Sequence, residues 1–371
     1  MIMNLICVWN FVVPCSRGSM GRFQLSTRAM PVAALVMMVA CIRSSAALRL
    51  SSLQIDGVEF CLDDKTRGRK EHCGIVMMSF GRGYSEVAMK AAARTRGLKA
   101  QRGWCPLDPA LDYIPVTLFT DMPKATFSHC RPGWPRGRPH QPANVEVHPE
   151  EELGMWTGPP VGSKFDRLLD SDSHMRHLGS WKVRWYHAES ILHSPYTMTM
   201  YLDVDAYPCS AESISQLMWA LPKNGAAVGN PAYKAVTCQA SGGNCSDPHP
   251  PDLRPGEAAA WSRFHERNAG VLVADLRRAR PLLEDFARGI RRTAGSGRVT
   301  GDQYALREAL FKHRRGVPQM TFPEEDICRW KHSGRCERKG RKGCAIHHFP
   351  GGESLRLYGM VRDDSGDFAP G

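Results

Sequence analysis

Two aspartates, Asp203 and Asp205, end the apolar run Thr199-Met-Tyr-Leu-Asp-Val-Asp. Two carboxylates at this spacing could bind a ligand together. Side chains two positions apart on a strand project to the same side, so the run predicts that both carboxylates face one ligand. Two carboxylates so close together repel each other, which favours a divalent cation between them and a diphosphate. The carboxyl end of a parallel strand is also where open α/β sheets bind nucleotides. The alternative is that the two acids only form a helix cap or a turn.

Context, rather than spacing, distinguishes this pair. The triplet Asp170-Ser-Asp172 has the same spacing but lies in a polar stretch with no apolar strand before it, so we interpret it as solvated surface. Asp203 and Asp205 instead follow an apolar strand, which itself follows a helical pattern that ends at Ser194-Pro195. We therefore take the second pair as the candidate site.

Strand and helix patterns alternate around this pair, with no internal repeat. Runs rich in β-branched and aromatic residues predict strands at 72–80, 114–120, 197–203 and 269–274. Helical spacing predicts helices at 85–96, 179–193, 281–291 and 302–312. Segments 126–160 and 238–257 are dense in Pro and Gly, so we expect a long loop and a flexible insertion there. The alternation predicts an α/β, Rossmann-like fold with a mostly parallel central sheet and helices on both faces.

The formal charge of +12 is concentrated in two places. Residues 1–50 hold five arginines and no acid, and residues 328–344 hold seven basic residues against one acid. These segments carry +5 and +6, which leaves +1 for the rest of the 371 residues, an ordinary surface. We therefore exclude nucleic acid as a partner of the body of the protein.

The N-terminal residues have the pattern of a secretory signal. Arginines precede the apolar run 30–42, and Ser44-Ser45-Ala46 after it suits signal peptidase. The run is shorter than the roughly 20 residues of a spanning helix. We predict that residues 1–47 are a cleaved signal peptide, with a short Golgi-type membrane anchor or a buried core helix as alternatives. Residues 48–350 would then form the folded domain, and residues 351–371 a C-terminal tail.

An even number of cysteines, ten, follows residue 47. Behind a secretory signal this count predicts up to five disulfides in an oxidising lumen, with no connectivity implied. Asn244-Cys245-Ser246 is the only glycosylation sequon, which predicts a glycoprotein if it is exposed. The ten are Cys61, Cys73, Cys105, Cys130, Cys209, Cys238, Cys245, Cys328, Cys336 and Cys344.

Over residues 74–350 the chain resembles the GT-A nucleotide-diphospho-sugar transferases, the glycosyltransferases with a DxD motif. The matching segments, in order, are CGIVMMSFGRGYSEVAMKAA, IPVTLFTDMP, SWKVRWYHAESILHSPYTMTMYLDVDAYPC, ERNAGVLVADLRRA, GDQYALREAL and CAIHHFP. This resemblance implies a GT-A fold and a catalytic domain over residues 48–350. The chain departs from it at Asp326-Ile-Cys328-Arg329, where such transferases often have Asn-Cys-Arg, so the role of that loop stays open.

The resemblance also implies a metal site. It assigns Asp203 and Asp205 to Mn²⁺ or Mg²⁺, one of them shared with the ribose of the donor. In similar enzymes a histidine on a late strand completes the metal shell, and His347 or His348 in Ala-Ile-His-His-Phe stands there. We favour Mn²⁺, because it accepts one imidazole among oxygen ligands more readily than Mg²⁺ does. The alternative for both histidines is an ordinary polar strand end.

Three further residues are candidates for binding the nucleotide part of the donor. Tyr84 resembles a tyrosine that stacks on the base, although plain packing on the sheet is an alternative. Lys182 and Arg184 could neutralise the diphosphate together with the metal, or could simply be solvated on a helix.

Four residues resemble those of the sugar and acceptor sites. Asn268-Ala-Gly270-Val matches an Asn-x-Gly-Val strand, in which the asparagine and the bare glycine backbone border the sugar pocket. Asp302-Gln303 matches an acid-amide pair that contacts the sugar or acceptor from a helix N-terminus, while N-capping is the alternative for Asp302.

The predicted reaction is sugar transfer from a UDP- or GDP-sugar to a hydroxyl of a glycan or glycoprotein. An inverting enzyme needs a carboxylate base, for which Asp302 and three acids at 324–326 are candidates, and a retaining enzyme does not. One rival hypothesis is a basic zinc module that binds nucleic acid through three late cysteines and His347, but their spacing matches no standard zinc pattern. The second rival is a catalytically inactive relative that binds glycans or polyanions through residues 328–344.

Overall fold

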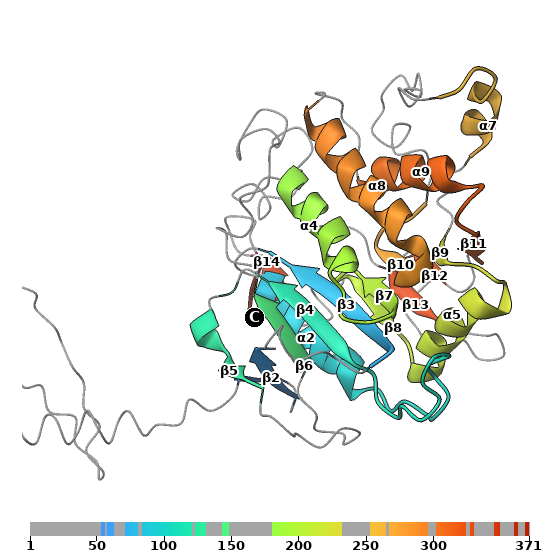
Figure 1. The fold of residues 1–371 in the computed structure, drawn as a ribbon. Coiled ribbons are helices and arrows are strands. Elements are labelled where there is room, and N and C mark those ends of the chain that lie inside the picture. The colour runs from blue at the N-terminus through green and yellow to red at the C-terminus, as the bar shows by residue number, and fades with distance from the viewer. Residues whose placement is uncertain are drawn as a thin grey trace, which may run out of the picture. The chain divides into compact units, whose positions relative to one another are not determined.

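A computed structural model describes part of the chain, and every described residue lies between Leu53 and Pro370 (Figure 1). Among them, no helix is both long enough and apolar enough to cross a membrane. The described residues are 53–55, 58–62, 71–80, 84–120, 122, 124–130, 143–147, 180–231, 253–264, 267–295, 302–323, 327–329, 345–348, 360–362 and 368–370.

Several predictions concern residues outside this set. Some predicted features lie outside the description: the signal or anchor at 1–47, the sequon at Asn244, most of the insertion 238–257, the acids at 324–326 and residues 330–344 of the basic segment. The side chains of Tyr84, Lys182 and His348 do so too. These expectations stay predictions.

A mixed central sheet organises the described residues (Figure 1). Six strand pairs are parallel, namely β2 with β5 and β6, β6 with β4, β4 with β3, β3 with β7, and β9 with β11. Three pairs are antiparallel, which confirms a mostly parallel sheet. In order the strands are β1 (Leu53–Ile55), β2 (Val58–Leu62), β6 (Ala143–Val147), β4 (Val116–Thr120), β3 (Cys73–Ser79), β7 (Met198–Leu202), β10 (Val271–Asp275), β9 (Val228–Pro231) and β11 (Gln319–Phe322), with β5 (Ser128–His129) beside β2.

Helices cover both faces of this sheet, as expected. One apolar core joins α2 (Tyr84–Gly97) and α5 (Ala211–Lys223) to alternate residues of the strands, such as Met200. A second core joins α4 (Ser180–Leu192), α8 (Leu276–Gly295) and α9 (Asp302–His313) to the opposite face, to which Tyr201 belongs. Strands β7 and β10 are buried over their whole length, which is typical of a sheet with both faces covered. A short helix, α7 (Ala258–Arg263), and a 3₁₀ turn, η1 (Lys124–Thr126), complete the described helices.

The segment 126–160, which we expected to be only a long loop, contributes a strand to the middle of the sheet. Strand β6 pairs in parallel with β2 on one side and β4 on the other. Its five residues, Ala-Asn-Val-Glu-Val, are too few to give a clear periodic signal between Pro-rich and Gly-rich flanks. The prediction of an unbroken loop was therefore wrong.

Helix α5 was also absent from the sequence prediction, although its signals are ordinary. The Ser210 hydroxyl oxygen accepts a hydrogen bond from the Ser213 backbone N–H at 3.1 Å and so caps the first turn. Apolar residues then recur at helical spacing and are all buried. They include Ile214, Leu217, Met218 and Leu221.

A second, three-stranded sheet lies beside the end of β7. It contains β12 (Ile327–Arg329), β13 (Ile346–His348) and β8 (Ala206–Pro208) in that order. Strand β8 follows Asp205 directly, so the pairing brings the late segment of the chain next to the acidic pair. In the segment predicted as a tail, β14 (Met360–Arg362) pairs with β15 (Phe368–Pro370).

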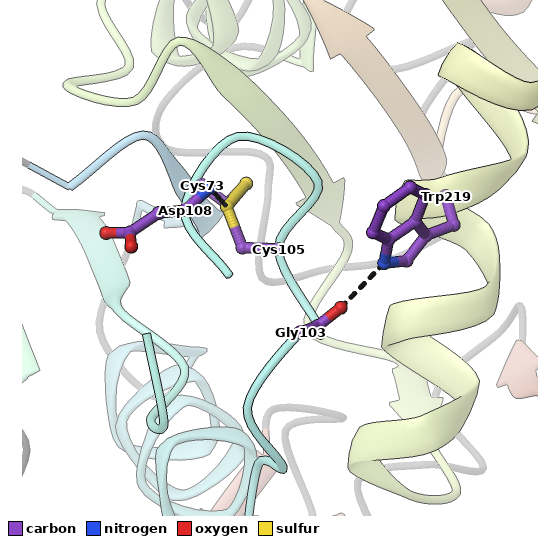
Figure 2. The surroundings of a disulfide bond; sticks show 5 residues. All are labelled: Cys73, Gly103, Cys105, Asp108 and Trp219. Atoms are coloured by element: carbon purple, nitrogen blue, oxygen red, sulfur yellow. Dashed lines mark hydrogen bonds between the residues drawn. A yellow bond between two sulfur atoms is a disulfide. The ribbon is translucent and has the colours of Figure 1, made fainter. Parts of the chain in front are cut away.

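Disulfides join Cys61 to Cys130 and Cys73 to Cys105, and Cys209 is also disulfide-bonded. The second of these fastens the start of β3 to the loop after α2, where the Trp219 indole N–H of α5 donates to the Gly103 carbonyl oxygen at 2.7 Å (Figure 2). Disulfides form and persist in oxidising compartments, so this pairing indicates such an environment.

Candidate active site at the end of strand β7

The two aspartates lie in a tight turn between β7 and β8. Strand β7 ends at Leu202, and the Ala206 N–H donates to the Asp203 carbonyl oxygen at 2.9 Å, which closes a four-residue turn. Both acidic residues are partly exposed. The turn, rather than the alternation of a strand, therefore positions Asp205, so our argument from strand geometry was wrong for that residue. The backbone matches the alternative that we left open.

Tyr201 shows that three carboxylates gather here. Its hydroxyl donates to Asp203 Oδ1 at 2.8 Å from a fully buried position on β7. Burial, the charge and hydrogen bond of Asp203, and the charges of Asp302 and Asp205 raise the pKa of this phenol well above its usual value. Because all three carboxylates act on one phenol, the fold brings together the acids of the β7–β8 turn and the first residue of α9.

Asp302 is held as a carboxylate. Burial alone would raise its pKa, but the hydrogen bond to His187, the charge of Arg184 and the Gln303 backbone N–H more than offset burial and lower the pKa below its usual value. Its Oδ2 lies 3.2 Å from His187 Nδ1, and its Oδ1 accepts the Gln303 N–H at 2.9 Å. Asp302 thus accepts the Gln303 N–H of the first turn of α9 with one oxygen and faces His187 with the other.

His187 and Tyr201 belong to this cluster, and the sequence analysis did not identify either of them. The imidazole of His187 is 3% exposed and stacks on the Tyr201 ring at 4.0 Å between centroids. A signal was present in the spacing, because His187 lies one helical turn after Arg184, and Tyr201 precedes Asp203 by two.

The predicted sugar-site residues border the same place. The Asp203 N–H donates to the Gly270 carbonyl oxygen at 2.8 Å, so the Asn268-Ala-Gly270 segment lies against the acidic turn. Asn268 is 4% exposed. Among the described residues, its Oδ1 and the Oε1 of Gln303 are buried and have no hydrogen-bond partner. Buried amide oxygens of this kind are the groups that a bound hydroxyl would satisfy.

The topology pairs the strand of the two histidines with the strand that follows the acids. In the antiparallel pair of β13 and β8, His347 stands opposite Tyr207 and His348 opposite Ala206, directly after Asp205. The His347 side chain is buried. Within the described part of the chain, no group of three or more Asp, Glu, His or Cys side chains is close enough to hold a metal ion. The described donors that suit a hard divalent cation are thus the carboxylates of the turn, which would need oxygens from a ligand to complete a shell.

The remaining candidates lie on the elements that lead to the site. Arg184, on α4, is partly exposed, and its charge acts on Asp302. Tyr84 is the first residue of α2, and Lys182 is the third of α4.

No protein-family model matches the chain, and no curated protein matches it. Many solved structures are similar to it, and they include the following three. Mouse xyloside xylosyltransferase 1, in its apo form, shares 16% identity with a TM-score of 0.39, over 76% of this chain and 98% of that chain. The galactosyltransferase LgtC, in complex with donor and acceptor sugar analogues, shares 15% identity with a TM-score of 0.41, over 75% and 87%. The mannosyltransferase Ktr4p from S. cerevisiae, in complex with GDP, shares 12% identity with a TM-score of 0.38, over 80% of each chain. All three are glycosyltransferases by name, and the function proposed below rests on the residues of the site itself.

Proposed function

We propose that this protein is a glycosyltransferase that moves a sugar from a UDP- or GDP-sugar to a hydroxyl of a glycan or glycoprotein. One observation carries the proposal: the Tyr201 hydroxyl bonds to Asp203 where β7 ends, and the charges of Asp302 and Asp205 act on the same phenol. Strand β7 runs parallel to β3, and β3 runs parallel to β4, so this edge is the carboxyl end of the parallel strands. Open α/β sheets bind nucleotides at that edge.

The acidic turn can bind a diphosphate only if a cation lies between the carboxylates and the phosphates. Asp203 and Asp205 would bind Mn²⁺ or Mg²⁺, with His347 or His348 as a further ligand from β13. The cation would act as a Lewis acid on the diphosphate leaving group. Arg184, on α4, supplies positive charge that acts on Asp302. Lys182, two residues earlier in the sequence, is kept as a second candidate cation.

Residues around the turn would orient the two substrates. Asn268 and Gln303 offer buried amide oxygens to sugar hydroxyls. Gly270, beside Asp203, leaves room for a sugar because it has no side chain. Asp302, held as a carboxylate, would accept the proton of the acceptor hydroxyl in an inverting reaction, or stabilise positive charge on the donor sugar in a retaining one.

We further propose that the protein works in the lumen of the secretory pathway, in the Golgi. Residues 1–47 would be its signal peptide or its membrane anchor. The disulfides Cys61–Cys130 and Cys73–Cys105 support an oxidising compartment.

A panel of nucleotide sugars tests the function. The protein, expressed through a secretory host, is incubated with each UDP- and GDP-sugar with and without Mn²⁺, and release of the nucleotide is measured. We expect release from at least one donor that depends on Mn²⁺ and is abolished in Asp205→Ala. Asp112→Ala removes an exposed carboxylate before β4, at the opposite edge of the sheet, and is the matched control. A folded protein that releases nucleotide from no donor would contradict the proposal and favour a non-catalytic protein that binds glycans or polyanions.

A further inference from the structure

A continuous series of side-chain contacts connects the acidic turn to helix α9. The Tyr201 hydroxyl donates to Asp203 Oδ1 at 2.8 Å, the Tyr201 ring stacks on His187 at 4.0 Å, and His187 Nδ1 lies 3.2 Å from Asp302 Oδ2. These residues come from β7, α4 and α9, three elements far apart in the sequence. His187 is the central member of the series.

His187 is enclosed by other side chains. Its side chain is 4% exposed, the Tyr201 ring covers one face at an interplanar angle of 21°, and the Phe286 ring meets it edge-on at 5.8 Å. An imidazole buried between these rings does not contact a substrate. Its effect on a reaction must therefore pass through the residue that it contacts, Asp302.

The hydrogen-bonding pattern fixes which ring nitrogen carries the proton. Asp302 is a carboxylate and only accepts, so His187 Nδ1 must be the donor. In the neutral ring Nε2 is then an acceptor, and among the described residues it is buried with no hydrogen-bond partner. A buried acceptor without a partner is less costly than a buried N–H, which agrees with this tautomer.

Asp302 needs such a contact because its position is electrostatically unfavourable. It is buried at the start of α9, and burial alone would raise its pKa and disfavour the charged form. The Gln303 N–H holds one of its oxygens, and His187 holds the other. Two contacts, one on each oxygen, fix the plane of the carboxylate, as outer contacts fix the ligands of a metal.

We infer that His187 is a positioning residue that holds the Asp302 carboxylate in its working orientation and ties it, through Tyr201, to the acidic turn. This role rests on the proposed function, because it gives Asp302 a substrate to act on. It also has a consequence that does not depend on turnover: without the His187 contact, the Asp302 carboxylate rotates and releases the Gln303 amide.

Two substitutions of His187 separate positioning from packing. His187→Phe keeps a flat ring between Tyr201 and Phe286 but removes the donor to Asp302. His187→Asn loses the ring but carries an amide N–H close to the place of Nδ1. We expect His187→Phe to lower kcat about 10- to 100-fold, the usual cost of losing an outer contact, with donor KM changed less than about threefold. We expect His187→Asn to restore most of kcat.

A histidine directly after the same helix provides the control. His193 Nε2 lies 3.3 Å from Glu189 Oε2, but this pair is on the surface, with the histidine side chain 66% exposed. His193→Phe should leave kcat, KM and the melting temperature unchanged. A role in packing alone predicts the reverse order of the His187 variants, with His187→Phe close to the wild type and His187→Asn impaired, and that order would overturn the inference.

Amide hydrogen exchange decides the inference without any turnover. The Gln303 amide should exchange faster in His187→Phe than in the wild type and return towards the wild-type rate in His187→Asn. If no nucleotide sugar is turned over by the wild type but this exchange pattern holds, the proposed function fails and the positioning role stands. Unchanged Gln303 exchange in His187→Phe would overturn the positioning role whatever the activity.

Discussion

The Tyr201 hydroxyl donates a 2.8 Å hydrogen bond to Asp203 Oδ1, and the same Tyr201 ring stacks on His187. Because burial and three nearby carboxylates raise the pKa of this phenol well above its usual value, it stays protonated, and remains a donor, over the working range of pH. Tyr201 thus fixes one oxygen of Asp203 at the edge of the site.

We expect Tyr201→Phe to weaken sugar transfer while the fold is kept. The substitution retains the ring against His187 but removes a hydrogen bond to a charged group, a kind of bond worth about 1.5–3 kcal/mol. Asp203 then becomes free to turn, and kcat/KM for the donor should fall by at least about tenfold. The matched control is Tyr196→Phe, which removes a buried hydroxyl that is bonded to Thr117 Oγ1. Equal activity of the two variants would show that Tyr201 does not act on the site.

Gly74→Ala should destabilise the protein because strand β3 passes directly against an aromatic ring. A methyl group at Gly74 would lie 2.4 Å from the Tyr196 ring, which is 2% exposed and cannot move aside freely. We expect a loss of about 2 kcal/mol in the free energy of unfolding, measured by urea denaturation. Gly97, at the end of α2, has open space where its methyl group would be, so Gly97→Ala should be neutral or slightly stabilising. A Gly74→Ala protein as stable as the wild type would mean that the ring can shift.

Removal of the Cys73–Cys105 disulfide, by replacing both cysteines with alanine, should lower the free energy of unfolding by about 3–4 kcal/mol. This disulfide closes a loop with a sequence separation of 32, and the cost follows from the entropy that the unfolded chain regains. Trp219→Phe removes only the indole hydrogen bond to the same loop and should cost about 1 kcal/mol (Figure 2). Melting temperatures without reductant give the comparison, and a smaller effect for the double cysteine variant than for Trp219→Phe would contradict it.

Asp285 should make the free energy of unfolding fall as the pH is lowered. Burial alone would raise its pKa, but hydrogen bonds from Lys312, Arg288 and His313 outweigh burial and hold the pKa well below its usual value. A depressed carboxylate pKa adds stability above the unfolded pKa of about 4, and that stability is lost as the pH falls through the folded value. Because Arg288 and Lys312 are about 60% exposed, screening keeps the contribution near 1 kcal/mol.

Asp285→Asn should therefore destabilise the protein by about 1 kcal/mol at pH 7 and progressively less below about pH 4. Urea denaturation at pH 7 and pH 3 measures the difference. Glu284→Gln changes the neighbouring acid, which has only a 4.0 Å contact with Arg288, and should cost less than about 0.5 kcal/mol at either pH. A difference that grows as the pH falls would show that the sign of this argument is wrong.

The parts of the fold that the sequence predicted are those with a strong local signal. Strand β7 is a continuous apolar run, and α4 and α9 show helical spacing, so their type and place could be predicted. Strand β6 and the second sheet could not, because strands of three to five residues acquire their identity from distant partners, as β13 does from β8. Helix α5 was missed although its cap and its apolar spacing were both present.

In the candidate site, too, some residues have a local signal in the sequence and others depend on the fold. Asp203 and Asp302 carry recognisable neighbours in the sequence, so they could be identified before the fold was known. The spacing of His187 from Arg184 and of Tyr201 from Asp203 could have suggested each residue, but the stacking of one on the other depends on how α4 packs against β7. The turn that holds Asp205 was equally hidden, since an apolar run gives no sign of the residue at which the strand stops.

The order of the strands across the sheet differs from their order along the chain, which is the order in which they are synthesised. Strand β2 emerges early, but its neighbour β6 is made about eighty residues later, after β3 and β4. Cys61, on β2, likewise has to wait for its partner Cys130, while Cys73 and Cys105 are synthesised in between. A nascent chain therefore passes through a stage at which the wrong thiols are the nearest ones. A cell that makes this protein needs an isomerase that can reshuffle such early bonds, and the yield should depend on it more than for a protein whose cysteines pair in sequence.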